Sequence, residues 1–322
     1  MTAFLAGLLT SAVTAWPIYR FLLAIRSRQT VSVHVKEHAH KQGTPTMGGL
    51  LVLAGLAGVL GLFASNGRTS LALGLTVFLS LLAFVGFVDD FLIPRLMPGK
   101  RGLGWIPKLA MQFGTTAIGL WTLGFYPGST FAIALLAVIF YANAFNFADG
   151  LDWLSGTILI SFMIGVLLIG GSYGIQGDLA LGLLGSMIPF MVLNRPKAKI
   201  FMGDVGSMPL GGLLGLFVLC LALPEIRQLL VGNTLELATM RPEQHPYRWL
   251  ALLILSFVMF AELLPPPLQI LSVKLTGKRI FPMTPIHHAF QKAGWPETRV
   301  VALFSGVQLL CSLVAWGVDG IR

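Results

Sequence analysis

The sequence from Ser70 to Val88 reads SLALGLTVFLSLLAFVGFV, contains no charged residue and is followed at once by Asp89 and Asp90. A helix needs about 20 mostly apolar residues to cross the hydrocarbon core of a bilayer. This stretch is long enough for one crossing. It therefore predicts a transmembrane helix with a pair of acids at its end.

The composition of the whole chain agrees with this interpretation. Of its 322 residues, 55% are hydrophobic and 11% are charged, and the mean hydropathy is +0.80; soluble domains have roughly 25% charged residues. These values exclude a soluble globular enzyme, a disordered chain and a nucleic-acid-binding module. The net charge of +9 then favours a polyanionic or lipid-headgroup substrate at a membrane surface.

Further apolar runs of similar length occur along the chain, and we expect one all-α domain over residues 1–322 with about ten transmembrane helices. The ninth run contains Glu262 and the triplet Pro265-Pro266-Pro267. Proline removes a backbone donor and clashes with the preceding turn, so we expect this helix to be broken. The ten runs cover residues 3–25, 47–65, 70–88, 106–124, 129–146, 154–171, 177–194, 206–223, 248–273 and 300–317.

The loop charges predict the orientation of these helices. The loops after the odd-numbered runs hold sixteen Lys and Arg residues, and the loops after the even-numbered runs hold three. Cytoplasmic loops carry the excess of Lys and Arg. The sequence therefore predicts that the odd loops are cytoplasmic and that both termini are extracytoplasmic.

The same odd loops carry most of the unusual polar residues, including five acids at helix ends. Acids beside hydrocarbon are costly and usually functional, although Asp152 could simply cap the sixth helix. Asp89 and Asp90 at a helix C-terminus oppose the helix dipole, so we expect a metal ion or basic side chains nearby. Carboxylate ligands favour Mg²⁺. The five acids are Asp89, Asp90, Asp149, Asp152 and Asp204.

Other polar features of these loops are consistent with an anionic substrate. His287 and His288 lack the spacing of metal ligands, so phosphate or sugar contacts are the better interpretation. The segments 43–46 and 203–207 lead into predicted helices, whose N-terminal N–H groups could bind an anion. Each of these signals is weak alone.

Together, the loops resemble the polyprenyl-phosphate N-acetylhexosamine-1-phosphate transferase superfamily, and most closely its phospho-N-acetylmuramoyl-pentapeptide transferase family. The resemblance runs from about Lys41 to Glu297, and its motifs are specific in combination. They read KQGTPTMGG at 41–49, FMGDVGS at 201–207, PIHH at 285–288 and GWPE at 294–297.

The resemblance implies transfer of phospho-N-acetylmuramoyl-pentapeptide from UDP-N-acetylmuramoyl-pentapeptide to undecaprenyl phosphate. The products are UMP and lipid I, and the enzyme would be Mg²⁺-dependent, in the bacterial inner membrane, with a cytoplasmic active site. By position, the implied catalytic residues are Asp89, Asp90, Asp204 (also the Mg²⁺ ligand), His287 and His288. The implied substrate-binding residues are Lys41, Thr46, Lys108 near the phosphates, Asn146, Asp149, Asp152, Asn194 and Phe201, which would stack on uracil.

The chain departs from the family pattern at four places. Ala289 replaces the third histidine of a usual triplet, and Gln291 replaces a usual glutamate. A lysine that usually follows the acid pair is replaced near Ile93, and Trp153 stands where glycine usually follows Asp152. No acid is lost, so we expect the chemistry to be retained and the effects to concern sugar–peptide selectivity and the surroundings of the diphosphate.

Two other functions remain open on the sequence. A sister transferase would use another UDP-N-acetylhexosamine, and a secondary transporter would also place polar residues in a helical bundle. Transporters usually bind near the membrane midplane, whereas these acids are predicted at one face. The broken ninth helix is a candidate wall for a prenyl groove. Gly212 and Gly215 would permit close helix packing, which is compatible with a homodimer but does not establish one.

Cysteine labelling tests the predicted topology. Lys197→Cys should be protected from an impermeant thiol reagent added outside intact cells, whereas Gly67→Cys should react. Labelling of Lys197→Cys from outside would contradict the arrangement.

Overall fold

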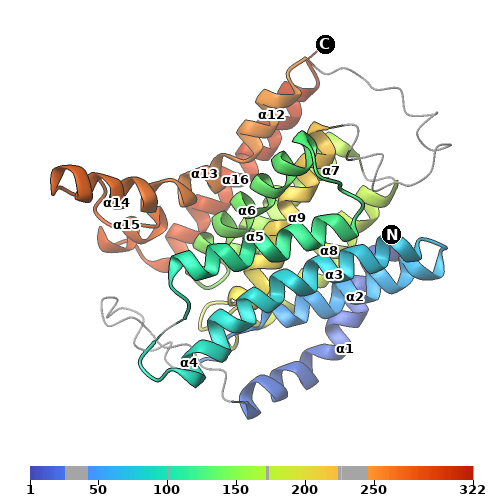
Figure 1. Ribbon diagram of the computed structural model, residues 1–322, viewed down its shortest axis with the longest axis horizontal. Helices are drawn as coiled ribbons and strands as arrows, with labels where there is room; N and C mark the ends of the chain where they lie inside the picture. The colour runs from blue at the N-terminus through green and yellow to red at the C-terminus, as the bar shows by residue number, and fades with distance from the viewer. Residues whose placement is uncertain (26–42, 101, 172–173, 224–225, 227–245, 322) are drawn as a thin grey trace.

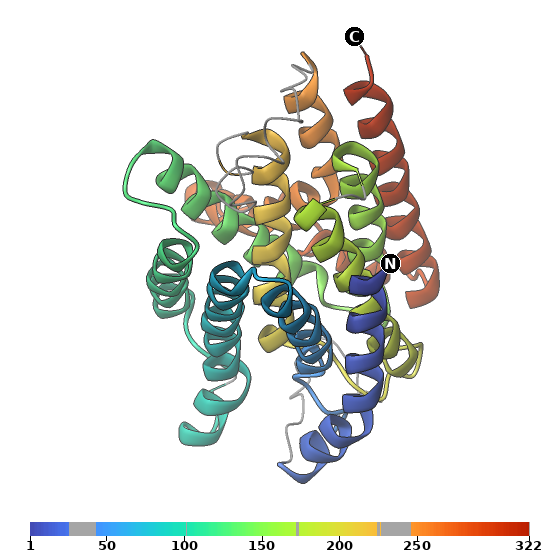
Figure 2. The ribbon, with the colours of Figure 1, turned by 90° about the vertical axis from the view of Figure 1, so that its right-hand side faces the viewer.

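The computed structural model describes residues 1–25, 43–100, 102–171, 174–223, 226 and 246–321, and these residues form helices and connecting segments with no strand. Lys41 lies outside the described residues. The helices pack as one bundle (Figure 1). Seen from the side, α16 (Glu297–Asp319) runs along one edge of the bundle (Figure 2), against α7 (Leu154–Gly170) and α12 (Arg248–Leu255).

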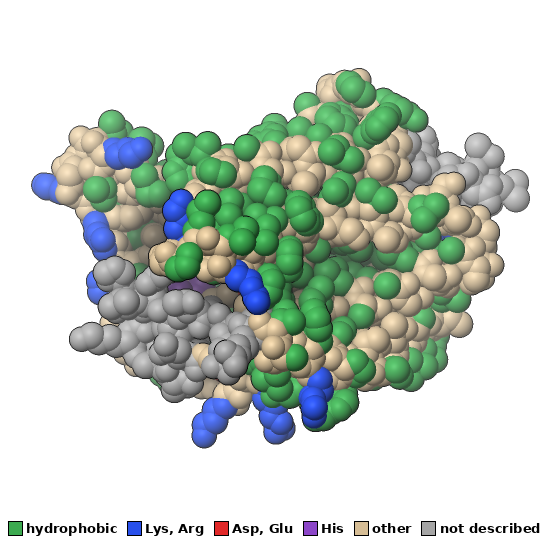
Figure 3. Space-filling view, turned by 60° about the horizontal axis from the view of Figure 1, so that its bottom comes forward, with side chains coloured by type: hydrophobic (Ala, Val, Ile, Leu, Met, Phe, Trp, Pro, Cys, Tyr) green, Lys and Arg blue, Asp and Glu red, His purple; other side chains and the backbone are tan. Residues whose placement is uncertain are grey.

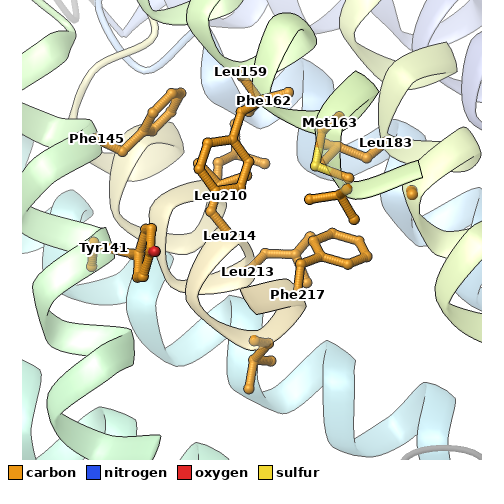
Figure 4. Packing of buried hydrophobic residues seen from close by; sticks show 14 of the residues in the cluster. Tyr141, Phe145, Leu159, Phe162, Met163, Leu183, Leu210, Leu213, Leu214 and Phe217 are labelled. Carbon is orange, nitrogen blue, oxygen red and sulfur yellow. The ribbon is translucent and has the colours of Figure 1, made fainter. Parts of the chain in front are cut away.

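The centre of the bundle is α9 (Asp204–Ala222), in which all residues except Asp204, Val218 and Ala222 are buried. A helix that is apolar on every side is stable only when other helices surround it. Its Leu and Phe side chains meet those of α6 (Ser129–Ala148), α7 and α8 (Gly174–Leu193), as Figure 4 shows. Because α9 is fixed on all sides, its first residue, Asp204, has a fixed position.

Glycines allow two helices to approach α9 near that first residue. The Cα of Gly49, in α2 (Gly49–Ser65), lies against Gly206, and a Cβ at either glycine would overlap the other. Gly86, in α3 (Thr69–Phe87), lies against the backbone of Asp204 and leaves no room for a Cβ. These contacts bring the end of α3 directly beside the start of α9.

Each of the ten predicted runs corresponds to helical structure. Of the described helical segments, seven are long and apolar enough to cross a membrane, and two shorter apolar helices, α2 and α7, accompany them. The fourth predicted helix, α5 (Trp105–Thr122), is not among these nine. The protein is therefore a polytopic, all-helical membrane protein. The first of the seven is α1 (Thr2–Ala24).

The break predicted in the ninth run is confirmed, and a second interruption accompanies it. The chain forms α12, α13 (Phe257–Leu263) and α14 (Pro265–Thr276), with the proline triplet at the start of α14. The additional interruption is at Ser256, whose hydroxyl donates to the Leu252 carbonyl at 2.7 Å, a contact that bends helices. In Figure 1, α14 extends outward from the bundle.

Asp89 and Asp90 do not end a helix as expected. The helix continues through a π-helical turn, Val88–Leu92, and α4 (Ile93–Leu96). π-helical turns are rare in proteins, and those that occur are often found at functional sites. The acids are therefore presented from inside a helix rather than at its C-terminus.

Gly212 and Gly215 do not face outward for a dimer. Both are buried in α9, where Gly212 lies against Leu82 and Gly215 against Val138. They serve packing within the chain.

Candidate active site

Three carboxylates gather where α3 meets α9. One oxygen each from Asp89, Asp90 and Asp204 lies within 4.8 Å of the others. The first two acids come from the π-helical turn and the third from the first turn of α9. The sequence predicted these residues as the catalytic acids, and the structure brings all three together.

Lys108, in the first turn of α5, connects two of these acids. Its Nζ donates to Asp89 Oδ2 at 3.1 Å and to Asp204 Oδ2. The Leu103 amide donates to the other oxygen of Asp89 at 2.6 Å. The expected positive partner of the acid pair is therefore Lys108, whose side chain is 18% exposed.

Asp90 and Asn146 fix Asp204 from two sides. The backbone amide of Asp204 donates to Asp90 Oδ2 at 2.6 Å, so an anion lies at the N-terminus of α9 as the helix dipole favours. Asn146, near the end of α6, donates to Asp204 Oδ1 at 2.6 Å and to the Ser207 hydroxyl at 2.8 Å. Backbone and side chain of Asp204 are thus both held.

Asp149 and Thr46 flank Gly203, the residue before Asp204. The Gly203 amide donates to Asp149 Oδ2 at 3.2 Å, and the Ser155 hydroxyl donates to Asp149 Oδ1 at 2.7 Å. A Cβ on Gly203, which has φ +68°, would lie 2.5 Å from the Thr46 hydroxyl oxygen. Burial raises the pKa of the Asp149 carboxyl to about 6.

A second group of predicted residues surrounds the start of α7. Asp152 does not cap this helix; its Oδ2 accepts from the Ala198 amide at 3.0 Å, and its own amide donates to Glu297 Oε1 at 2.6 Å. Asn194 accepts from the Trp153 amide at 2.8 Å and donates to the Ile200 carbonyl at 2.8 Å. These residues hold the 194–200 segment against the start of α7.

The N-terminus of α2 is not open to an anion as expected. The amides of Gly48 and Gly49 donate to the carbonyls of Phe201 and Met202 at 2.7 and 2.9 Å. Phe201 also donates from its amide to the Pro45 carbonyl at 2.9 Å. The Phe201 backbone is therefore fixed, and its stacking on a base stays a prediction.

The two histidines lie at the start of α15 (Ile286–Lys292) in different surroundings. His287 is fully buried, and its Nδ1 lies 2.9 Å from Glu262 Oε2. His288 is partly exposed, and its Nδ1 lies 2.7 Å from Gln291 Oε1. The side-chain oxygen of Gln291 thus contacts His288. A glutamate, the usual residue at this position of the family pattern, also has a side-chain oxygen that could make this contact.

The three acids have the donor set that a divalent cation requires. Their carboxylates offer only oxygen ligands, which Mg²⁺ prefers. Among the described residues, Lys108 contacts two of the three carboxylates, so with all three ionised a dication would balance the charge that remains.

Sequence reasoning missed several residues that support this site. Ser207 and Ser155 contact Asn146 and Asp149, and serines in apolar helices carry no clear signal. Glu262 did carry one, because an acid inside an apolar run is rare. Its partner His287 is 25 positions further along the chain, so only the fold shows the pair.

Comparison with known proteins places the chain in a class and then in a family. Residues 72–222 match the family Glycosyl transferase family 4, and with the helical bundle this defines a membrane-embedded transferase. Residues 41–53 match phospho-N-acetylmuramoyl-pentapeptide-transferase signature 1. The chain belongs to the phospho-N-acetylmuramoyl-pentapeptide-transferase family.

Relatives of that name support this membership over almost the whole chain. The protein from Thermotoga maritima is 32% identical, with 94% of this chain and 96% of the relative aligned. The protein from Symbiobacterium thermophilum is 34% identical, covering 97% and 92% respectively. The protein from Carboxydothermus hydrogenoformans is 32% identical, covering 92% and 91%.

The raised pKa of Asp149 predicts a pH-dependent contribution to stability. The folded-state pKa of about 6 exceeds the unfolded value of about 3.9, so the fold favours the protonated acid. This contribution is complete below the unfolded pKa and is lost as pH rises through about 6. The Tm of the purified protein, relative to Asp149→Asn, should therefore fall between about pH 4 and 7. A difference in Tm that stays constant over this range would contradict the assignment.

Proposed function

We propose that this protein transfers phospho-N-acetylmuramoyl-pentapeptide from its UDP-linked donor to undecaprenyl phosphate, releasing UMP and forming lipid I for peptidoglycan synthesis. The observation that carries this proposal is the cluster of Lys108 and the three acids in a chain that belongs to the family. Because the chain belongs to a family of transferases, the transporter alternative is no longer needed.

The cluster suits phosphoryl transfer because that chemistry depends mainly on positioning and on neutralising charge. The Nζ of Lys108 bridges Asp89 and Asp204, so it is positioned to contact a diphosphate that enters beside them. The phosphate of the lipid acceptor is largely dianionic at pH 7, because its second pKa is about 6. A general base then contributes little, and in this proposal Asp89 and Asp90 act mainly by positioning.

Mg²⁺ is the proposed cofactor, held by Asp204 with Asp89 and Asp90 beside it. When bound, the ion would neutralise charge that develops on the diphosphate. The residues of the chain orient this arrangement: Asn146 fixes one oxygen of Asp204 and Lys108 contacts the other.

An apolar cavity beside the acids suits the prenyl chain of the acceptor. Its volume is about 590 Å³, and it lies between α1, α2 and α3. Three of its lining residues, Met47, Phe91 and Val205, directly neighbour Thr46, Asp90 and Asp204 in sequence. A lipid chain in this cavity would have its phosphate next to the acids. The broken ninth helix remains the alternative wall for the chain.

We propose that the site faces the cytoplasm of a bacterial cell. Lys and Arg side chains border the face drawn in Figure 3, and a histidine lies in a recess between them. A basic face of this kind is expected on the cytoplasmic side and would attract a soluble, polyanionic donor.

A direct assay tests the function and separates it from the sister-transferase alternative. Purified protein with undecaprenyl phosphate and Mg²⁺ should release UMP from UDP-N-acetylmuramoyl-pentapeptide and form a lipid-linked product. UDP-N-acetylglucosamine should give no product. Product from UDP-N-acetylglucosamine alone would establish the sister activity instead.

Two variants should each weaken the binding of one substrate only, because the two substrates are proposed to bind in different subsites. Phe201→Ala should raise the KM for the nucleotide-sugar at least about fivefold, because base stacking contributes about 1–3 kcal/mol, and leave the KM for the lipid unchanged. Ala83→Trp fills the apolar cavity and should raise the KM for the lipid alone. If Ala83→Trp is silent while Leu268→Trp in α14 raises that KM, the ninth helix holds the chain.

Removal of one acid tests the metal site. Asp204→Asn should lower kcat by about 100-fold or more and weaken Mn²⁺ binding measured by electron paramagnetic resonance, with partial recovery of activity at high Mg²⁺. The control is Asp178→Asn, which removes an acid of α8 outside the cluster and should leave Mn²⁺ binding unchanged. Equal Mn²⁺ binding by both variants would contradict the proposed role of Asp204.

A further inference from the structure

Glu262 and His287 form an acid–histidine pair that is closed off from solvent. Glu262 lies in α13 and His287 in α15, and both side chains are 0% exposed. The distance from His287 Nδ1 to Glu262 Oε2 is 2.9 Å. If Glu262 is a carboxylate, which only accepts hydrogen bonds, this contact requires the proton of the imidazole to be on Nδ1.

Burying this pair between two helices is unfavourable for the stability of the protein. Within the described part of the chain, Glu262 Oε1 and His287 Nε2 have no hydrogen-bond partner. Each unsatisfied buried polar group is destabilising, and apolar residues of the same size often stabilise as well as a buried pair or better. The pair is therefore better explained by the geometry that it imposes than by stability.

Two contacts and two pairs of adjacent residues connect His287 to the acid cluster. The unpaired Nε2 of His287 lies directly against Gly150, where a Cβ would overlap it. Gly150 follows Asp149, whose Oδ2 accepts from the Gly203 amide at 3.2 Å. Gly203 in turn precedes Asp204. Movement of the imidazole would therefore displace the turn that supports the start of α9.

We propose that Glu262 is a positioning residue for the transfer reaction, which holds the His287 imidazole in its Nδ1–H form against Gly150 and thereby keeps Asp149 and Asp204 in place. Glu262 does not contact the reacting groups in this arrangement. The inference rests on the proposed function for its kinetic consequence, but its structural content, the tautomer of His287, is independent of any substrate.

Two variants of Glu262 separate geometry from charge. Gln at this position keeps an oxygen that can accept from Nδ1, whereas Ala removes the acceptor. Glu262→Ala should lower kcat by about 10- to 100-fold, as loss of supporting contacts does at other sites, with little change in either KM. Glu262→Gln should retain kcat within about threefold of the wild type, since the acceptor remains.

A spectroscopic measurement provides the readout that simple destabilisation would not change. In ¹⁵N-histidine-labelled protein, His287 should show the Nδ1–H pattern in the wild type and in Glu262→Gln, and should lose it in Glu262→Ala. The signal is assigned by its absence in His287→Asn. The matched control is Tyr141→Phe, which removes a buried hydrogen bond to Ser256 and should leave both kcat and the His287 signal unchanged.

The outcomes distinguish this inference from the proposed function. Loss of the Nδ1–H pattern together with lower kcat in Glu262→Ala, and retention of both in Glu262→Gln, supports the positioning role. An unchanged pattern in Glu262→Ala overturns it, and so does a kcat in Glu262→Gln as low as in Glu262→Ala. If the wild type forms no lipid product, the proposed function fails, and the tautomer measurement still decides whether Glu262 positions His287.

Discussion

The contact of Lys108 with Asp89 and Asp204 is the interaction on which the arrangement of the site depends. It joins α5, the π-helical turn after α3 and the start of α9. Without that ammonium, carboxylates from two helices would face each other at an exposure of about 15%, where repulsion is weakly screened. The cation makes it possible for α3 and α9 to approach, and the glycines between them set how closely.

The bundle and the site are therefore parts of one arrangement. Gly49 and Gly86 allow backbone contact at the start of α9, and the apolar sides of α9 keep it in the centre of the bundle. Asn146 and Asp149 reach the same point from the end of α6. The helix packing of the membrane domain thus fixes polar groups that a surface loop would leave mobile.

The sequence was sufficient for features that depend on local composition. Apolar runs predict helices whatever their neighbours are, and the proline triplet predicts the break before α14. The continuation of the helix through Asp89 and Asp90 could not be predicted, because the cation that contacts Asp89, Lys108, is 19 positions away. From the sequence, Glu262 could be identified only as an unusual acid within an apolar run, because its role depends on His287 in a different helix. The anion site expected at the N-terminus of α2 is not open, because the amides there already donate to the carbonyls of residues 201–202.

Trp153 has a consequence for how the chain can move. Its φ of +69° lies in the left-handed region, where a side chain costs about 1–2 kcal/mol. Its amide donates to Asn194 and its indole Nε1 to the Met191 carbonyl, both at 2.8 Å. A glycine at this position would serve as a hinge. With tryptophan, the loop beside Asp152 is clamped to the end of α8, so any rearrangement of that loop on substrate binding must carry the end of α8 with it.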